Sequence, residues 1–516
     1  MPKRLNSYDN GVSLMVNEQI HHGNQFKKIL KHGSWYFLSS LLTRASLFLL
    51  IPVYTRYLSP TEFGILGNFE AVTRLLPFLI SLYLNAAFSR YYYLEREVSE
   101  EQAKRLYSTH FWFVCLWGSV VIIVGLVVST FTLVPLVEVP FFPYIPLVFA
   151  PSLLNQLAIM GSLVFRANLK AREISVLNLV GFAASTSLTL VLLVPCKMGV
   201  LARLYGAALG PLINFVVFTV IAVRSSLLEF VFDVTMLRRG LLYSLPMIPN
   251  VAGGWINRIS DRLILTYYGK LSEVGLYSLS AQIAYILYLI NDATTQVQGP
   301  ISMSALTEDT QAGKEQISEF LSFYICLILF FYLGLTFFSK EVLHFLTDER
   351  FHSAYQIVGL LAFPYVLSGV NRVFTTIIAF HGKTWVISSG AILSALGNIV
   401  LNFTFIPYFG QVAAAWASML SRATNAIWVI YWAQKTDPVP INFGIVGPSF
   451  SVAFILVVVQ QVVQANQWLG FWQMAAFKIL LILFYWLPFL VLPSFQAVRH
   501  KLLGRLHTVI RNARLT

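Results

Sequence analysis

The octapeptide YLSPTEFG at residues 57–64 returns in altered form as YGKLSEVG at residues 268–275, 211 positions further along the chain. A second set of matches has nearly the same offset and pairs Lys170 to Arg172 with His381 to Lys383, and Gly199 with Gly410. Each match taken alone has an ordinary cause, because helix starts favour acids and turns favour glycine. The offset that the matches share nevertheless predicts an internal repeat of two six-helix bundles in the same orientation, which is a usual transporter design.

The composition places these bundles in a membrane. Of the 516 residues, 57% are apolar and only 11% are charged, whereas roughly 25% of the residues in an average soluble protein are charged. Apolar runs of about 20 residues, long enough to cross a bilayer, predict fourteen transmembrane spans. These spans lie near residues 34–58, 63–88, 107–130, 141–165, 174–194, 204–224, 239–267, 273–298, 317–339, 355–379, 384–406, 411–432, 441–463 and 471–494.

The repeat and the spans together predict five segments. They are a cytoplasmic amino-terminal segment (1–33), an amino-terminal six-helix lobe (34–230), a carboxyl-terminal six-helix lobe (231–435), two additional transmembrane helices (436–495) and a basic cytoplasmic tail (496–516). Most of the 36 lysines and arginines would lie on one side of the membrane, which predicts both termini in the cytoplasm. The net charge of +13 then reflects topology and anionic lipid head groups and predicts no nucleic-acid partner.

Several classes of protein are excluded by what the sequence lacks. No connection between spans reaches the size of a domain, and no nucleotide-binding, metalloprotease or nucleophile-elbow motif occurs. Cys115, Cys196 and Cys326 are odd in number and lack paired spacing, so they predict neither a disulfide framework nor a metal site. We therefore expect a protein that is not an enzyme, has no cofactor and acts within the bilayer.

Charged residues inside the predicted spans are mainly basic. A cation near the bilayer centre costs roughly 3 kcal/mol, so seven facing lipid would cost about 20 kcal/mol, more than the roughly 5–15 kcal/mol that stabilises a typical protein. Most of these side chains must therefore face a wet interior. The basic residues are Arg44, Arg74, Arg258, Arg262, Arg372, Arg422 and Lys478, and the acids are Glu70, Asp261 and Asp292.

Four short motifs follow one another along the chain: TR at 43–44, IPVYTRYLSPTEFG at 51–64, SDRLIL at 260–265 and EVGLY at 273–277. Their order and spacing resemble the Wzx-type flippases of the polysaccharide transporter family. That family belongs to the multidrug/oligosaccharidyl-lipid/polysaccharide exporter superfamily, whose members have two six-helix lobes around a central cavity, often with two further helices. The resemblance implies an all-α, polytopic membrane fold.

The same resemblance implies a function. Flippases of this family move an isoprenoid (undecaprenyl) diphosphate-linked oligosaccharide from the cytoplasmic to the outer leaflet of the bacterial inner membrane, for O-antigen of lipopolysaccharide, capsule or exopolysaccharide. The implied mechanism is alternating access driven by a gradient of H⁺ or Na⁺. The implied partners, besides membrane lipids, are a polysaccharide polymerase and chain-length proteins.

Two predicted spans carry polar stripes that suit a diphosphate with attached sugars. A guanidinium supplies fixed charge, and hydroxyl and amide groups supply hydrogen bonds. In the alternative interpretation, each arginine bonds to backbone or caps a neighbouring helix. On one helical face each, the stripes are Ser418, Ser421, Arg422 and Asn425, and Ser368, Asn371, Arg372 and Thr375.

Other spans add candidates for substrate binding. Arg44 has no acid within reach on its own helix, so we expect it to contact phosphate. Arg258 and Arg262 flank Asp261, which would neutralise at least one of them.

Arg74 either pairs with Glu70, four residues before it, or binds substrate. Lys478 either faces the interior or extends to the membrane surface. Pro246, Pro249, Gly253 and Gly254 predict a bent helix just before Arg258.

A coupling ion requires an acid within the membrane. Asp292 has no obvious partner on its own helix and is the first candidate, with Asp261 and Glu70 behind it. Alternatively, Asp292 neutralises an arginine of the other lobe. The aromatic residues, 15% of the chain, are expected to form interfacial belts more than platforms for sugars, although a few could do both.

Two rival functions are considered. A multidrug exporter of the same fold would expel organic cations and would need an acidic, aromatic cavity, contrary to the excess of arginine. A membrane glycan polymerase or ligase would carry a large outer loop with catalytic residues, whereas the longest predicted outer connection, near residues 340–354, is short.

Overall fold

The computed structural model describes residues 42–43, 48–168, 170–308, 310–466 and 468–487. Within these ranges every regular element is a helix, and ten helices are long and apolar enough to cross a membrane. The predicted all-α, polytopic fold is confirmed. One of the ten helices, α15 (Thr384–Thr436), covers two of the predicted spans by itself. The predicted terminal segments 1–33 and 496–516 lie outside the described residues.

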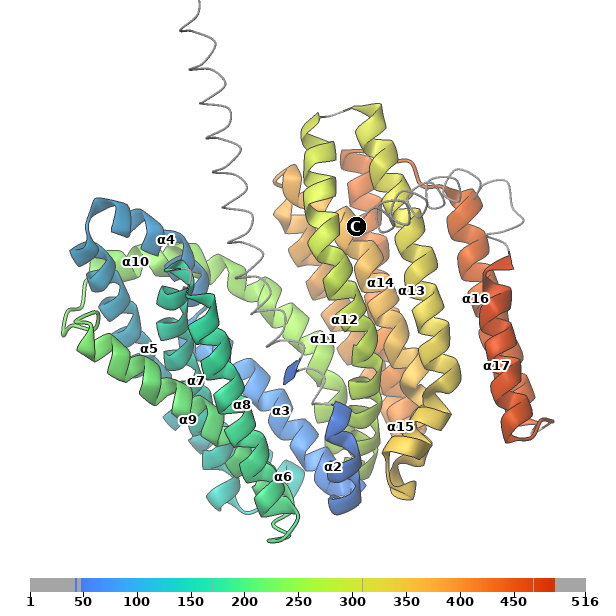
Figure 1. The fold of residues 1–516 in the computed structure, drawn as a ribbon, viewed down its shortest axis with the longest axis horizontal. Coiled ribbons are helices and arrows are strands. Elements are labelled where there is room, and N and C mark those ends of the chain that lie inside the picture. Colours follow the sequence, from blue (N-terminus) through green and yellow to red (C-terminus); the bar gives the residue numbers. More distant parts are fainter. Residues whose placement is uncertain (1–41, 44–47, 169, 309, 467, 488–516) are drawn as a thin grey trace, which may run out of the picture. The chain divides into compact units, whose positions relative to one another are not determined.

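The chain groups into two compact units (Figure 1). The first unit holds the described residues up to Tyr57 together with Val72–Ile248, and the second holds Leu58–Ala71 and the described residues from Pro249 onward. The helix α3 (Pro60–Ser81) is therefore divided between them.

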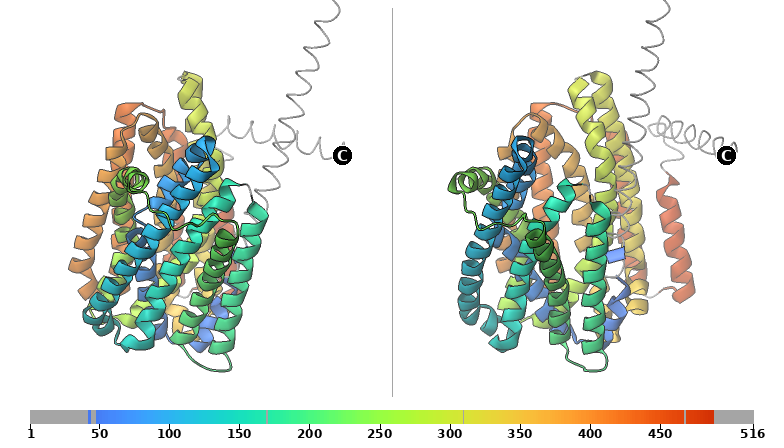
Figure 2. Two further views of the ribbon diagram at one scale, coloured as in Figure 1. Left: turned by 90° about the vertical axis from the view of Figure 1, so that its left-hand side faces the viewer. Right: turned by 60° about the vertical axis from the view of Figure 1, so that its left-hand side comes forward.

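The first unit otherwise contains α2 (Ile51–Tyr57), α4 (Leu84–Val98), α5 (Glu100–Phe131), α6 (Leu133–Val137), α7 (Phe141–Ala167), α8 (Ala171–Leu193), α9 (Val200–Arg224), α10 (Val234–Ser244) and a 3₁₀ turn, η1 (Leu245–Met247). Helix α10 packs on α4 and α5 (Figure 2), and its Leu237 is buried against Leu84 and Ala87 of α4. The second unit contains α11 (Ile248–Tyr267), α12 (Leu271–Glu308), α13 (Gln311–Leu346), a 3₁₀ turn, η2 (Glu349–Ala354), α14 (Tyr355–Phe380), α15, α16 (Phe443–Ala465) and α17 (Phe471–Tyr485).

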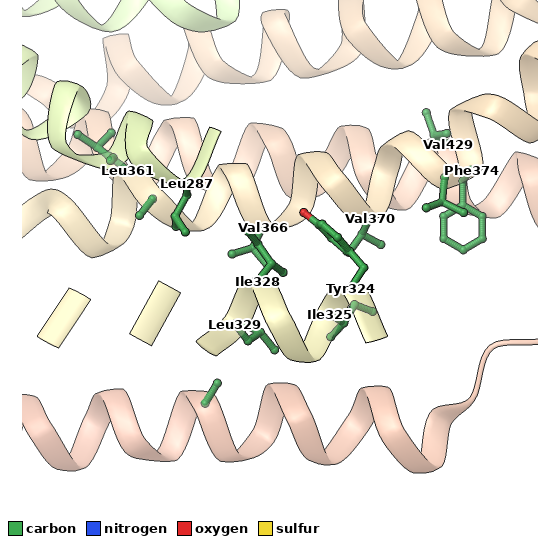
Figure 3. Packing of buried hydrophobic residues seen from close by; sticks show 14 of the residues in the cluster. Leu287, Tyr324, Ile325, Ile328, Leu329, Leu361, Val366, Val370, Phe374 and Val429 are labelled. Atoms are coloured by element: carbon green, nitrogen blue, oxygen red, sulfur yellow. The ribbon is translucent and has the colours of Figure 1, made fainter. Parts of the chain in front are cut away.

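The core of the second unit lies where α12, α13 and α14 pack together. Figure 3 shows Leu287 of α12, Ile325 and Ile328 of α13 and Val366 and Val370 of α14 in this core. Burial of these aliphatic side chains and the close fit of their surfaces hold the three helices in register. The core thereby fixes the positions of polar side chains on the same helices.

The internal repeat is visible in the backbone. Gly199 precedes α9 with φ 55° and ψ −130°, and Gly410 interrupts α15 with φ 56° and ψ −135°. These angles are those of the first central residue of a type II′ turn, where glycine is preferred because it has no Cβ. Two turns with the same geometry thus occur 211 residues apart, at the offset that the repeat predicts.

The crossing of two helix starts explains the glycines of the repeated octapeptide. Helix α3 begins at Pro60 and helix α12 at Leu271, and the two helix starts cross in backbone contact within the second unit. A Cβ on Gly64 would lie 2.1 Å from the carbonyl oxygen of Leu271, and one on Gly275 would lie 1.9 Å from that of Pro60. The motif therefore recurs because both copies meet at one crossing where only glycine fits.

Substitution of Gly410 tests how strongly this turn is specified. Glu273 Oε2 accepts the N–H of Gln411 at 2.6 Å, and a Cβ on Gly410 would lie 2.0 Å from that oxygen. Because Gly410→Ala meets both this clash and a strained φ, we expect it to lower the free energy of unfolding by about 2–4 kcal/mol. Thermal unfolding of the purified protein in detergent measures the change.

Gly397→Ala is the matched control on the same helix. A Cβ on Gly397 would meet no atom of the described chain within 4 Å, so a gain of up to about 1 kcal/mol in helix propensity is expected. Equal melting temperatures for the two variants would contradict the assignment of the turn.

Helix α17 is joined to α13 by a buried ion pair. Lys478 is 0% exposed, and its Nζ lies 2.6 Å from Glu341 Oε1 on α13. The same two helices are also joined where the Tyr485 hydroxyl donates to the carbonyl oxygen of Cys326 at 3.2 Å. The structure thus places Lys478 inside the protein, where a carboxylate on the neighbouring helix neutralises it.

Removal of one partner of this ion pair should cost more than removal of both. We expect Lys478→Ala to destabilise the protein by about 3–5 kcal/mol, because Glu341 would keep a charge without its partner. The double variant Lys478→Met, Glu341→Leu is expected to recover most of that loss, since it fills the same space without charge. Melting temperatures of the single and double variants in detergent test this prediction. A double variant no more stable than Lys478→Ala would refute it.

Candidate functional site

Asp261 on α11 lies at the centre of a polar cluster inside the second unit. Its side chain is fully buried, with 0% exposure. One carboxylate oxygen, Oδ1, accepts a hydrogen bond from Asn402 Nδ2 at 2.6 Å. The other, Oδ2, accepts hydrogen bonds from Ser418 Oγ at 2.5 Å and from the Tyr277 hydroxyl. The donors come from α12 and from both halves of α15, so three separate stretches of chain must meet to build the cluster.

A further group of polar residues supports this arrangement. Asn398 Oδ1 accepts hydrogen bonds from Asn402 Nδ2 at 3.0 Å and from Ser260 Oγ at 2.5 Å. One turn away, Asn257 Oδ1 accepts from Ser394 Oγ at 3.2 Å and from Ser421 Oγ at 3.3 Å. We call Asp261, Tyr277, Asn398, Asn402 and Ser418 the Asp261 cluster.

The Asp261 cluster has unused hydrogen-bonding capacity. In the part of the chain that the structure describes, Asn398 Nδ2, Asn402 Oδ1 and Arg262 Nε are buried and have no hydrogen-bond partner. Buried polar atoms without a partner are rare, and each needs an explanation such as an ion or a water molecule. The next residue in the sequence, Arg262, is only 8% exposed, so its positive charge lies in the interior of the second unit.

Of these three atoms, Asn398 Nδ2 and Arg262 Nε are N–H donors, and only Asn402 Oδ1 is an acceptor that could contact a cation. Carboxylate, amide and hydroxyl oxygens are hard ligands, and the cluster offers one of the first kind with several of the others. Among the described residues no group of three or more His, Cys, Asp or Glu could hold a metal ion. The Asp261 cluster itself contains one carboxylate, that of Asp261.

The predicted arginine stripes lie on α14 and on the second half of α15. Asn371 Nδ2 donates to Asn425 Oδ1 at 3.0 Å, which joins the two stripes. Arg372 and Arg422 are both partly buried. Within the described chain the Arg372 guanidinium has neither an ion pair nor a hydrogen bond. Ser421 lies further inside, at 2% exposure, where it belongs to the group around Asn257.

The other predicted site residues are placed as follows. Glu70 and Arg74 lie four residues apart on α3 and are both exposed, and Asp292 is partly buried on α12. Arg44 and the side chain of Arg258 lie outside the described residues. The structure therefore brings Asp261, Arg262 and Ser421 into one polar region, and it joins the stripes of Arg372 and Arg422 beside Asn425.

Sequence reasoning missed three buried polar residues of α15, of which Asn402 bonds to Asp261 directly. Ser394, Asn398 and Asn402 follow one another at intervals of four residues in the predicted span 384–406. All three side chains are 0% exposed. This spacing places them on one helical face, so a search for polar stripes in every span would have found them.

Together the apolar helices, the buried carboxylate and the arginine stripes define a multi-pass membrane transporter. A sequence model of a family described as polysaccharide biosynthesis protein matches residues 29–304. This match covers more than half of the chain, and the protein therefore belongs to that family.

Two relatives from other organisms are similar in sequence. A protein of Haemophilus influenzae called Lsg locus putative protein 1 is 22% identical over 406 residues, which cover 75% of this chain and 95% of that protein. A probable low-salt glycan biosynthesis flippase of Haloferax volcanii, Agl15, is 22% identical over 206 residues. That alignment covers 40% of this chain and 44% of the Haloferax protein, so it spans less than half of that relative.

Solved structures show the same fold. The lipid II flippase MurJ in an inward closed conformation has a TM-score of 0.63 at 13% identity, with 85% of this chain and 98% of that chain covered. An inward-facing multidrug resistance transporter of the MATE family has a TM-score of 0.61 at 12% identity, covering 77% and 99%. At such low identity the likeness extends to the fold alone.

Proposed function

We propose that the protein is a flippase that moves an isoprenoid diphosphate-linked oligosaccharide from the cytoplasmic to the outer leaflet, for the assembly of a cell-surface polysaccharide. Membership of the polysaccharide biosynthesis family supports the glycan substrate. The observation that carries the proposal is Arg372, a partly buried cation inside the candidate span Glu349–Phe380 with no counter-ion among the described residues. Such a charge requires an anionic partner, and a diphosphate supplies one.

The neighbouring groups fit the rest of this substrate. Arg422 and Asn425 lie on the second half of α15, and the Asn371–Asn425 bond holds them beside the Arg372 stripe. Two guanidiniums match the two phosphates, while the amides and hydroxyls match sugar hydroxyls. Binding must stay weak enough for release on the far side, which favours partly exposed arginines over a closed cage.

The Asp261 cluster is proposed as the coupling site. A proton or Na⁺ bound there would replace the hydrogen bonds that the carboxylate accepts from α12 and α15. Because these bonds link three segments of the second unit, ion binding would favour one of two arrangements of the helices. Downhill movement of H⁺ or Na⁺ would then drive alternating access, with Asp292 and Glu70 as further candidates for ion contact.

The cellular setting is part of the proposal. We place the protein in the inner membrane of a bacterium with both termini in the cytoplasm, where undecaprenyl diphosphate is the carrier lipid. A polysaccharide polymerase and chain-length proteins would consume the flipped product. The chain carries out no covalent chemistry in this scheme. The multidrug resistance transporter of the same fold is the basis for the alternative, export of organic cations, which arginine stripes disfavour.

Mass spectrometry of isoprenoid-linked glycans tests the proposal in cells. Depletion of the protein is expected to cause a diphosphate-linked oligosaccharide to accumulate, and restoration of the wild-type chain should clear it. No accumulation, together with greater sensitivity of the depleted cells to cationic dyes, would instead place the protein among drug exporters.

A further inference from the structure

Three tyrosines form a compact aromatic group on α12 and α14 of the second unit. The rings of Tyr285 and Tyr288 are stacked, with centroids 4.8 Å apart and an angle of 18° between their planes. The ring of Tyr365 meets both edge-on, at 6.5 Å and 6.0 Å. Tyr365 packs against the core of the second unit, but all three residues are partly exposed, so the group also presents aromatic surface.

The depth of these tyrosines sets them apart from an interfacial belt. Tyr285 and Tyr288 lie close to the middle of the candidate span Leu271–Thr295, and Tyr365 lies at the middle of Glu349–Phe380. Belt tyrosines occur at the level of the lipid head groups, where the hydroxyl meets water. Partly exposed tyrosines at mid-membrane depth therefore indicate a polar path beside this face.

Neighbouring residues on the same two helices support this conclusion. On α12, Asp292 follows Tyr285 and Tyr288 at i+7 and i+4, and on α14, Arg372 follows Tyr365 at i+7. Seven residues are two helical turns, so Arg372 and Tyr365 share a face and are about 10 Å apart along the axis. A face with a carboxylate, a guanidinium and three tyrosines is unsuited to lipid contact.

A buried asparagine bonds to the backbone of the aromatic group. Asn291 of α12 is 1% exposed, and its Nδ2 donates to the carbonyl oxygen of Tyr365 at 3.1 Å. Asn291 Oδ1 accepts from the hydroxyl of Tyr324 on α13 at 2.9 Å. One buried amide thus ties three helices together directly under the aromatic group. Preorganised tyrosines lose little conformational entropy when a ligand binds.

We propose that Tyr285, Tyr288 and Tyr365 form a platform for a pyranose ring of the lipid-linked glycan. This inference rests on the proposed function, in which Arg372 binds the diphosphate. The apolar face of a pyranose packs on an aromatic ring while its hydroxyls bond to polar neighbours. A separation of about 10 Å from the arginine places the platform under the first or second sugar from the diphosphate. The platform would make the protein select for a glycan and not merely for a phosphorylated lipid.

The test compares two probes on the purified full-length protein. One probe is undecaprenyl diphosphate without sugar, and the other is the undecaprenyl diphosphate-linked oligosaccharide extracted from cells depleted of the protein. Affinities are measured by native mass spectrometry for the wild type, Tyr288→Leu and Tyr288→Phe. Tyr431→Leu is the control, because Tyr431 is an exposed tyrosine on α15 outside the group. Melting temperatures confirm that each variant is folded.

The expected result is specific to the sugar. Tyr288→Leu should weaken binding of the glycan-bearing lipid by between about twofold and tenfold and leave the sugar-free lipid unchanged, while Tyr288→Phe and Tyr431→Leu should behave like the wild type. Equal losses for both probes, or no loss for either, would overturn the platform and leave the flippase proposal standing. Failure of the wild type to bind either lipid would instead overturn the proposed function, and the platform with it.

Discussion

Asp261→Asn is expected to lower the rate of ion-driven transport at least about tenfold. Asparagine keeps the shape of the side chain but removes the charge that receives hydrogen bonds from Asn402, Ser418 and Tyr277. A hydrogen bond to a charged group contributes about 1.5–3 kcal/mol, and we expect the contact between the carboxylate and the coupling ion to contribute at least as much. Loss of this contact should weaken ion binding, and with it the ion-dependent rate, at least about tenfold. Transport into membrane vesicles with an imposed Na⁺ or H⁺ gradient measures this rate.

A matched control separates coupling from a general effect of losing an acid. Asp348 lies at the exposed start of η2 and bonds to Arg350 at 2.7 Å, far from the Asp261 cluster in sequence. We expect Asp348→Asn to leave the rate unchanged, because a surface ion pair contributes little. An Asp261→Asn protein that still responds fully to both gradients would exclude Asp261 as the coupling residue.

Arg372→Ala is expected to cause the second large effect, a loss of substrate binding. The wild-type guanidinium has no partner among the described residues, so its removal should cost the protein little stability. It should instead remove a charge-assisted contact with the diphosphate and weaken binding at least about tenfold. Cells that carry only this variant should accumulate the lipid-linked oligosaccharide.

Two variants refine that experiment. Arg372→Lys should recover part of the affinity, because lysine keeps the charge but loses the bidentate geometry of the guanidinium. Arg105→Ala should behave like the wild type, since Arg105 is an exposed residue that pairs with Glu101 on α5. If Arg372→Ala cleared the glycolipid as well as the wild type does, the role of the α14 stripe in binding would be refuted.

Features encoded within a short stretch of chain could be predicted from the sequence. The apolar runs predict the helices, and the shared offset of the repeat predicts that Gly199 and Gly410 are equivalent, because a turn geometry depends on a few adjacent residues. The stripes around Arg372 and Arg422 were visible for the same reason. A helix places residues at i, i+3, i+4 and i+7 on one face whatever it packs against.

Contacts between distant segments could not be predicted in this way. Asp261 and its partners Asn402 and Ser418 are 141 and 157 residues apart in the sequence, and only packing of α11 against α15 brings them together. The ion pair of Lys478 could not be predicted for the same reason, because Glu341 lies 137 residues before it on another helix. The grouping of the three tyrosines could not be predicted either, because the contacts of Tyr365 with Tyr285 and Tyr288 depend on the packing of α14 against α12.

Reconstitution of the purified protein into liposomes tests the central claim most directly. The liposomes would contain the undecaprenyl diphosphate-linked oligosaccharide in both leaflets, and a glycosidase that cannot cross the membrane would be added outside. With the wild type and an ion gradient, we expect glycolipid from the inner leaflet to become accessible, so that cleavage proceeds well beyond the outer-leaflet share. Liposomes with Arg372→Ala should stop at that share. Cleavage by wild-type liposomes that also stops there would contradict the assignment of this protein as a flippase.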